Sequence, residues 1–468
     1  MSARTSALVI AVLVGLTGAA SVVAWREYGE LEAQATVVHK AALLESENDG
    51  LRAALGEEQR KAADEQNETR RAGIEADVAA IRELPFKKPV VYESLDRAGI
   101  RQVVAGKLSE QYSDQEIKDM ATGYSAMGLL PPNFPLKQTY VSLLGEQIAA
   151  FYDQHQHKLF MFRDASLENS QNRVILAHEL THALQDQNFG LLKLALEIKD
   201  NDDRAAAASA LIEGDATLVM SQYMVKDLSW KTLADTATYS ATQSMEEIRK
   251  APRYMREMLV FPYIKGEQFC AAAYERGGFV ALTEVYADPP SSTAQILHPE
   301  KYFAIPREEP IQVEFADTTF QGEKPVADNV MGEMGTRLLF QETSLSANIA
   351  EKAAAGWRGD RYLVYDGGRE LVWKTVWRSP DAAHAAVFAF QQVLIGRFVG
   401  EVLDYPVTDL WLEATAAGSK TPIGRESFPG GQILSVARTS TNEVVFILTT
   451  NKESAEQLEK QFVGAQHG

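Results

Sequence analysis

The sequence predicts an α+β protein, with a mainly helical unit that carries the candidate site and a smaller α+β domain after it. Residues 94–130, 174–190 and 203–226 have the composition and apolar spacing of helices. Beyond about residue 325, the segments DRYLVYDG and ELVWKTVW alternate as strands do. A chain of 468 residues with 46% hydrophobic and 24% charged residues has the length for two or three structural units.

The N-terminus carries a candidate membrane segment. Residues 7–25 form a charge-free run of 19 residues after Arg4, just long enough to cross a bilayer as a helix. Arg4 before it and three glutamates after it favour an N-terminus inside the cell, with the rest of the chain outside the cytoplasm of a prokaryote. We therefore expect a single-pass anchor in the cell membrane. The small residues TGAAS leave a secreted protein with a cleaved signal peptide as the alternative.

Residues 26–83 are expected to form a helical stalk. The segment is rich in Glu, Ala, Arg and Gln and lacks proline. Val37, Ala41, Leu44 and Leu51 belong to an apolar series with three- and four-residue spacing, while Gly50 weakens it. A solvated spacer and a short dimeric coiled coil fit equally well, so a homodimer through the stalk stays open.

The globular part is expected to begin at LPFKKPVVYESL, residues 84–95, and to divide at about residue 325. In the first domain, 84–325, a hairpin over 147–164 precedes the helix of 174–190 and the Ala-rich helix of 203–226. Mostly helical residues 244–287 and a proline-punctuated loop over 287–302 follow. In the second domain, 326–468, a helix over 380–396 separates the strands from a final hairpin.

The charge and cysteine content exclude some classes of function. A net charge of −18, with no long run of Lys or Arg, argues against nucleic acid as a partner. Cys270 is the sole cysteine, so the chain has no internal disulfide and no cysteine-based metal site.

The segment VILAHELTHALQDQNFGL, residues 174–190, contains the candidate metal site. His178 and His182 are four residues apart, so a helix presents both imidazoles on one face, and Glu179 lies beside the first of them. Two neutral imidazoles can bind one zinc ion, and the carboxylate can take a proton from water. Because the surrounding residues are apolar, unpaired histidines there would be costly to bury.

A catalytic zinc ion usually has a third protein ligand. Glu213 in LIEGDAT is flanked by Leu211, Ile212, Leu218 and Val219, and an acid in such surroundings usually has a partner. Asp215 is the alternative third ligand, but the residues that flank it are less apolar than those around Glu213.

These two segments carry a resemblance. AHELTHALQDQ resembles the zinc-binding helix of thermolysin-like peptidases, including Asp186 four residues after the second histidine. LIEGDAT is similar to the glutamate-bearing helix of gluzincin peptidases, especially the aminopeptidase branch. The resemblance covers about 17 residues at the first segment and about seven at the second. Glu213 lies 31 residues after His182, whereas a separation of roughly twenty is usual in those families.

The resemblance implies a zincin-like catalytic domain with one zinc ion per chain and a peptide or protein substrate. His178, His182 and Glu213 would bind zinc, Glu179 would be the general base, and Asp186 would orient a ligand histidine. Catalysis of this kind also needs a strand edge to align the substrate, for which the 147–164 hairpin is the candidate.

A hydrogen-bond donor must also stabilise the developing oxyanion. His298 and Tyr302 in the loop QILHPEKY are the first candidates, and Tyr263 is the third. The remaining histidines are expected to be structural or exposed: His155 and His157 in a polar turn, and His384 on a C-terminal helix.

Two other functions stay open. The chain could be an inactive, anchored scaffold, or a zinc hydrolase acting on a bond other than the peptide bond. Metal content would separate a scaffold from an enzyme, and a panel of peptides and esters would separate the two hydrolases.

Overall fold

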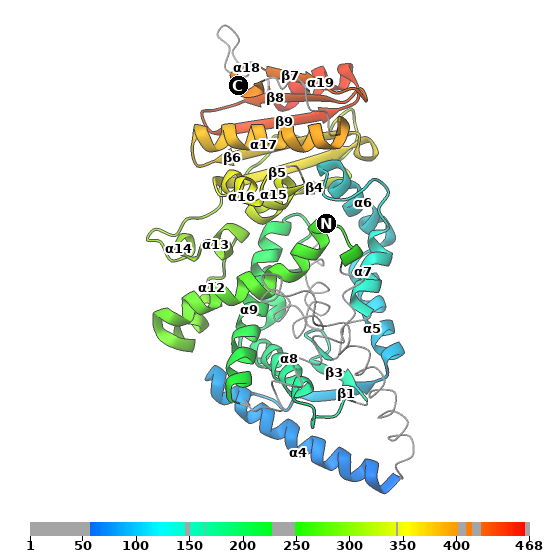
Figure 1. Cartoon of the computed structure of the whole chain (residues 1–468), viewed down its shortest axis with the longest axis vertical. Coiled ribbons are helices and arrows are strands. Elements are labelled where there is room, and N and C mark those ends of the chain that lie inside the picture. Colours follow the sequence, from blue (N-terminus) through cyan, green and yellow to red (C-terminus); the bar gives the residue numbers. More distant parts are fainter. Residues whose placement is uncertain are drawn as a thin grey trace.

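The computed structural model describes residues 57–145, 150–163, 165–226, 249–342, 345–400, 409–413 and 423–463. Its architecture is mixed α+β, with a mainly helical part and a C-terminal part built on a sheet (Figure 1). The predicted membrane segment and the stalk up to residue 56 lie outside the described residues. Within the described ranges, no helix has the length and apolar character to cross a membrane.

The helical part begins with one long helix and a small sheet. Its elements are α4 (Glu57–Arg82), β1 (Val91–Leu95), α5 (Arg97–Gln111), α6 (Asp114–Met127), α7 (Leu136–Gly145), β2 (Ala150–Asp153) and β3 (Lys158–Phe162). The strand order is β1-β3-β2, with β3 parallel to β1 and antiparallel to β2. The predicted hairpin is thus confirmed, and β2 lies at the edge of the sheet.

The next elements are α8 (Ser170–Phe189), the short 3₁₀ turns η2 (Leu191–Lys193) and η3 (Ala195–Glu197), α9 (Asp202–Lys226), α12 (Arg253–Val285), α13 (Thr293–Leu297) and α14 (Pro299–Tyr302). Asn169 caps the start of α8, and Gly190 ends it in the left-handed conformation that glycine adopts readily. Almost every residue of α8 between Val174 and Asp186 is buried. Such a helix has no polar face to expose, so it lies in the core and packs against α4 and α9.

The helices α9 and α12 make the most extensive contact in the helical part, and two glycines allow it. A Cβ atom at Gly214 would lie 2.1 Å from the carbonyl carbon of Gly266, and one at Gly266 would lie 2.1 Å from the Ala210 oxygen. Only glycine permits backbones to approach so closely. This contact fixes the position of Glu213 beside α12.

The end of α4 belongs to the core, which corrects the prediction of a stalk up to residue 83. Ile74, Val78 and Arg82 are buried, and α4 packs on α8 and α9. The predicted helical character is confirmed for residues 57–82. From about Ile74 onward the helix is part of the globular unit rather than a solvated spacer.

The C-terminal part is a six-stranded antiparallel sheet in the order β4-β5-β6-β9-β8-β7. The strands are β4 (Ala327–Asn329), β5 (Trp357–Tyr365), β6 (Glu370–Trp377), β7 (Ile423–Ser427), β8 (Ile433–Arg438) and β9 (Glu443–Thr449). The helices are α15 (Gly332–Gln341), α16 (Ala347–Ala354), α17 (Pro380–Phe398), α18 (Leu410–Glu413) and α19 (Lys452–Phe462). The predicted strands, the helix at 380–396 and the final hairpin are confirmed.

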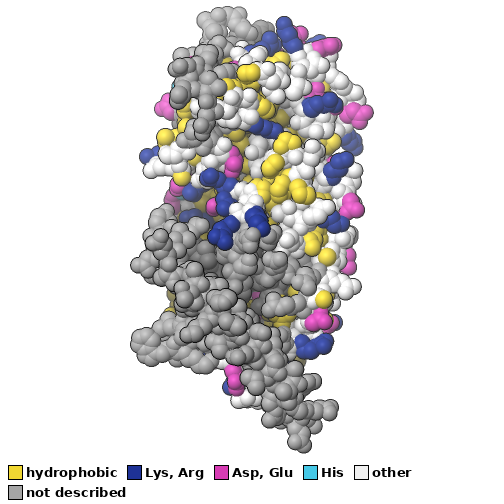
Figure 2. Space-filling model, turned by 45° about the vertical axis from the view of Figure 1, so that its right-hand side comes forward, with side chains coloured by type: hydrophobic (Ala, Val, Ile, Leu, Met, Phe, Trp, Pro, Cys, Tyr) yellow, Lys and Arg dark blue, Asp and Glu magenta, His cyan; other side chains and the backbone are white. Residues whose placement is uncertain are grey.

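Apolar side chains cover both faces of this sheet. On one face Trp373 and Phe446 of the sheet pack against Phe390 of α17, and on the other face Tyr365 contacts Phe462 of α19. The core beneath α17 is continuous with that of the helical part. On the face shown in Figure 2, acidic and basic side chains are interspersed with hydrophobic ones over the described surface.

Candidate metal centre

Three side chains from two helices converge in the core. His178 and His182 lie one turn apart on α8, and Glu213 reaches them from α9. The two Nε2 atoms are 3.0 Å apart, and Oε2 of Glu213 lies 3.2 Å from His178 Nε2 and 3.4 Å from His182 Nε2. His178 and Glu213 are fully buried, and His182 is 2% exposed. The structure therefore brings together the three predicted zinc ligands.

These separations fit one small cation. Zinc lies about 2.0–2.1 Å from its nitrogen and oxygen ligands, so two ligand atoms of a tetrahedral site lie about 3.3 Å apart. The three observed separations fall on both sides of this value. Within the described ranges, this is the one group of three potential ligands that meets such a geometry.

The charges of the three groups depend on one another. Burial lowers the pKa of His178 to about 4, so this imidazole is neutral. Burial also opposes charge on His182, but the nearby Glu213 carboxylate outweighs it and raises the pKa of His182 to about 9. Burial raises the pKa of Glu213 and the charge on His182 lowers it, with a net lowering. The site thus holds an anionic carboxylate that attracts a positive charge, either a proton or a metal ion.

Glu179 lies beside the three ligands without belonging to them. Its Oε2 accepts a hydrogen bond of 2.8 Å from the main-chain N–H of Tyr152 on β2. Its Oε1 is buried and has no hydrogen-bond partner in the described part of the chain. Burial raises the pKa of Glu179 well above its ordinary value, which makes the carboxylate a stronger base.

Among the residues that the structure describes, four buried polar atoms around this point have no hydrogen-bond partner: His178 Nδ1, Glu179 Oε1, Glu213 Oε1 and the Tyr263 hydroxyl. Tyr263 is on α12, and its ring centroid is 6.2 Å from that of His178. Burial raises the pKa of Tyr263 well above its ordinary value, and the charges of Glu213 and Glu179 raise it further. Unsatisfied polar atoms are rare in protein interiors, and Glu179 Oε1, Glu213 Oε1 and the Tyr263 hydroxyl are the ones that could bind a ligand at this point.

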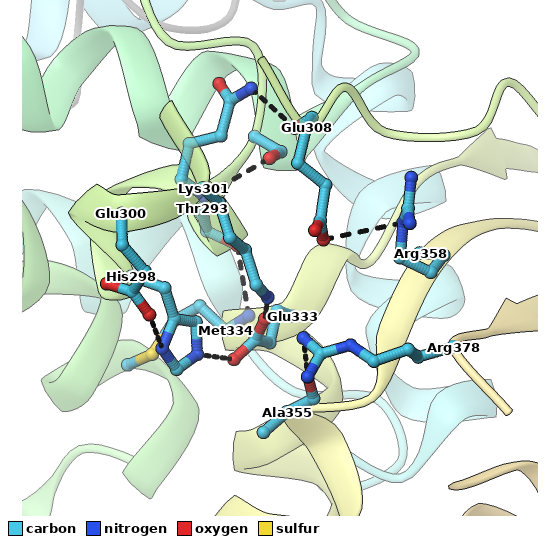
Figure 3. Close-up of polar contacts among 12 residues, drawn as sticks. Thr293, His298, Glu300, Lys301, Glu308, Glu333, Met334, Ala355, Arg358 and Arg378 are labelled. Carbon is cyan, nitrogen blue, oxygen red and sulfur yellow. Dashed lines mark hydrogen bonds and ion pairs between the residues drawn. The ribbon is translucent and has the colours of Figure 1, made fainter. Parts of the chain in front are cut away.

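The other two candidates for the oxyanion donor have partners elsewhere, and Figure 3 shows those of His298. His298 Nε2 lies 2.5 Å from Oε1 of the buried Glu333, which also accepts from Lys301. The Tyr302 hydroxyl donates to the main-chain oxygen of Asp288. Neither side chain has a described contact with the ligand triad, whereas Tyr263 has. Proximity therefore favours the third candidate over the first two.

Asp186 does not orient a ligand histidine, contrary to the prediction. Its carboxylate accepts from the Tyr152 hydroxyl and the Leu191 N–H and lies 2.7 Å from His157 Nδ1. The preceding residue, Gln185, contacts His182 instead, with Oε1 2.9 Å from Nδ1. Nothing in the sequence distinguishes Gln185, because a glutamine on a buried helix carries no metal-site signal of its own.

Asp215, the alternative third ligand, pairs with Arg82 of α4 rather than with the histidines. Of the remaining histidines, His155 pairs with Glu197, and His384 stacks on Trp411 near Asp409. None of these belongs to a group with metal-ligand geometry among the described residues.

Comparisons with known proteins add a family match in the other half of the chain. A domain of unknown function, DUF8575, matches residues 318–415, which contain none of the candidate ligands. No curated protein matches the chain. A crystal structure of a proposed hydrolase with a novel fold, from Chloroflexus aurantiacus, is similar with a TM-score of 0.32 and 18% sequence identity. That match covers 62% of this chain and 96% of the other.

Proposed function

We propose that this chain is a zinc-dependent peptidase. The observation that carries the proposal is the convergence of His178, His182 and Glu213 at tetrahedral separations, with Glu179 beside them and one oxygen unpaired. An inert core has no reason to bury this set of groups, whereas a catalytic metal site needs each of them.

The two Nε2 atoms and the Glu213 carboxylate would hold the ion. When bound, zinc supplies a Lewis acid that polarises the scissile carbonyl and acidifies water. Glu179 Oε1 is free to accept the proton of the attacking water and to pass it to the leaving amine. The hydrogen bond from the Tyr152 amide to Glu179 Oε2 holds the carboxylate in place and leaves the other oxygen for this work.

Substrate alignment would use the edge strand β2, which adjoins α8. An extended peptide can add to such an edge through main-chain hydrogen bonds. The Tyr263 hydroxyl, buried and unpaired beside the triad, is the donor best placed to stabilise a developing oxyanion. In this proposal the peptidase is anchored in the cell membrane by residues 7–25, with its catalytic part outside the cytoplasm.

The test combines metal content with a matched pair of variants. Purified full-length chain should contain one zinc ion and should cleave an unfolded protein. Glu179→Gln keeps the size of the side chain and an acceptor for the Tyr152 amide, so zinc should remain while hydrolysis falls at least about 100-fold. His182→Ala should lose zinc as well.

Each rival function predicts a different result. A wild-type chain without metal after metal-replete purification would indicate a scaffold. Zinc with hydrolysis of esters but not of peptides would indicate another class of hydrolase. Full peptidase activity in Glu179→Gln would exclude Glu179 as the base and refute the mechanism.

A further inference from the structure

We propose that Gln185, Asp215 and Arg82 form a buried positioning chain that holds His182 in its metal-binding orientation. The inference rests on the proposed metal site and goes beyond it, because it makes helix α4 a part of that site. None of the three residues contacts the metal-facing atoms directly, so each would act through its neighbour.

The first link fixes the tautomer of His182. Gln185 Nε2 lies 3.1 Å from Asp215 Oδ2 and 3.0 Å from the Ile212 oxygen, both of which are acceptors. The amide nitrogen must face these two atoms, so the amide oxygen faces His182 Nδ1 at 2.9 Å. An oxygen there requires a proton on Nδ1, so Nε2, which faces Glu213 and His178, is the nitrogen that can bind a metal ion. Gln185 thus selects the ligating form of the imidazole.

The second link holds Gln185. Asp215 is fully buried and accepts from Arg82 Nε at 2.8 and 3.0 Å, as well as from the Tyr286 hydroxyl at 2.8 Å. Without the guanidinium, the carboxylate would be an uncompensated charge in the core. Without the carboxylate, the amide nitrogen of Gln185 would lose one of its two acceptors.

The third link anchors the chain in α4. Arg82 is the last residue of that helix and is fully buried. Its guanidinium donates to the Thr283 hydroxyl at 3.0 Å and lies 4.9 Å from the centre of the Phe279 ring, both on α12. The segment that follows the predicted membrane anchor is therefore connected through three side chains to a metal ligand.

The experiment measures metal affinity in the full-length chain, independently of catalysis. Gln185→Met removes all three hydrogen bonds of the amide at nearly constant side-chain length. It should weaken zinc binding about 10- to 100-fold, measured in competition with a chromophoric chelator. The absorption bands of bound Co²⁺ should change as well, because the ligand geometry becomes less constrained. The control is Gln187→Met on the same helix, whose amide contacts Lys87 and Lys88 instead. It should bind zinc within about twofold of the wild type.

Asp215→Asn is the second variant, and it keeps the inference testable if Gln185→Met does not fold. It retains the size of the side chain but loses the charge opposite Arg82, and should weaken zinc binding at least about threefold. Wild-type affinity and an unchanged Co²⁺ spectrum in a folded variant at either position would overturn the positioning chain and leave the metal site intact. A wild-type chain that binds no metal would overturn the proposed function and this inference together. Zinc binding without peptidase activity would leave the inference standing.

Discussion

Replacing Gly214 by alanine tests whether the contact between α9 and α12 sets the geometry of the metal centre. The new Cβ would lie 2.1 Å from Gly266 C and 2.2 Å from Gly266 O, both backbone atoms that no rotamer change can move. Ordinary contact begins at 3.4 Å, so the helices must separate by about 1.3 Å, the difference between 3.4 and 2.1 Å. Glu213 and Tyr263 are on the two helices that separate.

The magnitude follows from this displacement. Overpacking of a core typically costs about 1–3 kcal/mol, and a 1 Å error in a catalytic group can lower the rate about 100-fold. We expect Gly214→Ala to lower the free energy of unfolding, measured in urea, by about 1–3 kcal/mol. The rate of peptide hydrolysis should fall by about two orders of magnitude. Zinc affinity should fall as well, because Glu213 moves.

A matched substitution separates this contact from helix propensity. Gly73 is exposed on α4, and a Cβ there would meet no atom within 4 Å. Gly73→Ala should therefore stabilise the chain by up to about 1 kcal/mol, the propensity difference between glycine and alanine. If Gly214→Ala shows the same gain together with wild-type zinc affinity, the steric argument is refuted.

Three further outcomes are expected. Tyr263→Phe removes only the unpaired hydroxyl, so kcat should fall about 100- to 1,000-fold with KM and zinc content nearly unchanged; wild-type kcat would exclude it as the oxyanion donor. Burial raises the pKa of Asp203 to about 7, so the folded state keeps a proton that the unfolded state has lost. Stability contributed by this group is full below the ordinary carboxyl pKa and is lost as pH rises toward 7. Between pH 5 and 8, the Tm of Asp203→Asn should accordingly fall less than the Tm of the wild type. Equal decreases in Tm would contradict the raised pKa of Asp203. Stripping the metal with a chelator should lower the Tm by several degrees. Readdition of zinc should restore the Tm, which should rise with the logarithm of the free zinc concentration, whereas a Tm indifferent to zinc would count against a bound ion.

The candidate ligand set could be predicted from the sequence because its signals are local. Two histidines four residues apart meet on one helix face whatever surrounds that helix. Glu213 is an acid inside an apolar segment, a combination that is rarely buried without a partner. The strand and helix segments of the C-terminal part could be found for the same reason, since side-chain periodicity depends only on the backbone of each element.

The supporting residues could not be found in this way. Gln185 and Asp186 are adjacent, both polar and both near a ligand, and what separates them is the direction in which each points from α8. That direction matters only because Asp215 of α9 lies on one side and β2 on the other. Likewise, the choice of Tyr263 over His298 depends on the crossing of α9 and α12 at two glycines, which no pattern within either helix reveals.

By itself, the sequence determined which residues could bind a metal, because helix geometry relates neighbours one turn apart. Only the tertiary structure decided what holds them, because Arg82 and Asp215 are 133 positions apart and meet through the packing of α4 against α8 and α9. The predicted stalk therefore ends inside the core. A buried charge requires an oppositely charged or hydrogen-bonding partner. The position of that partner depends on how the helices pack and not on the spacing of residues along the sequence.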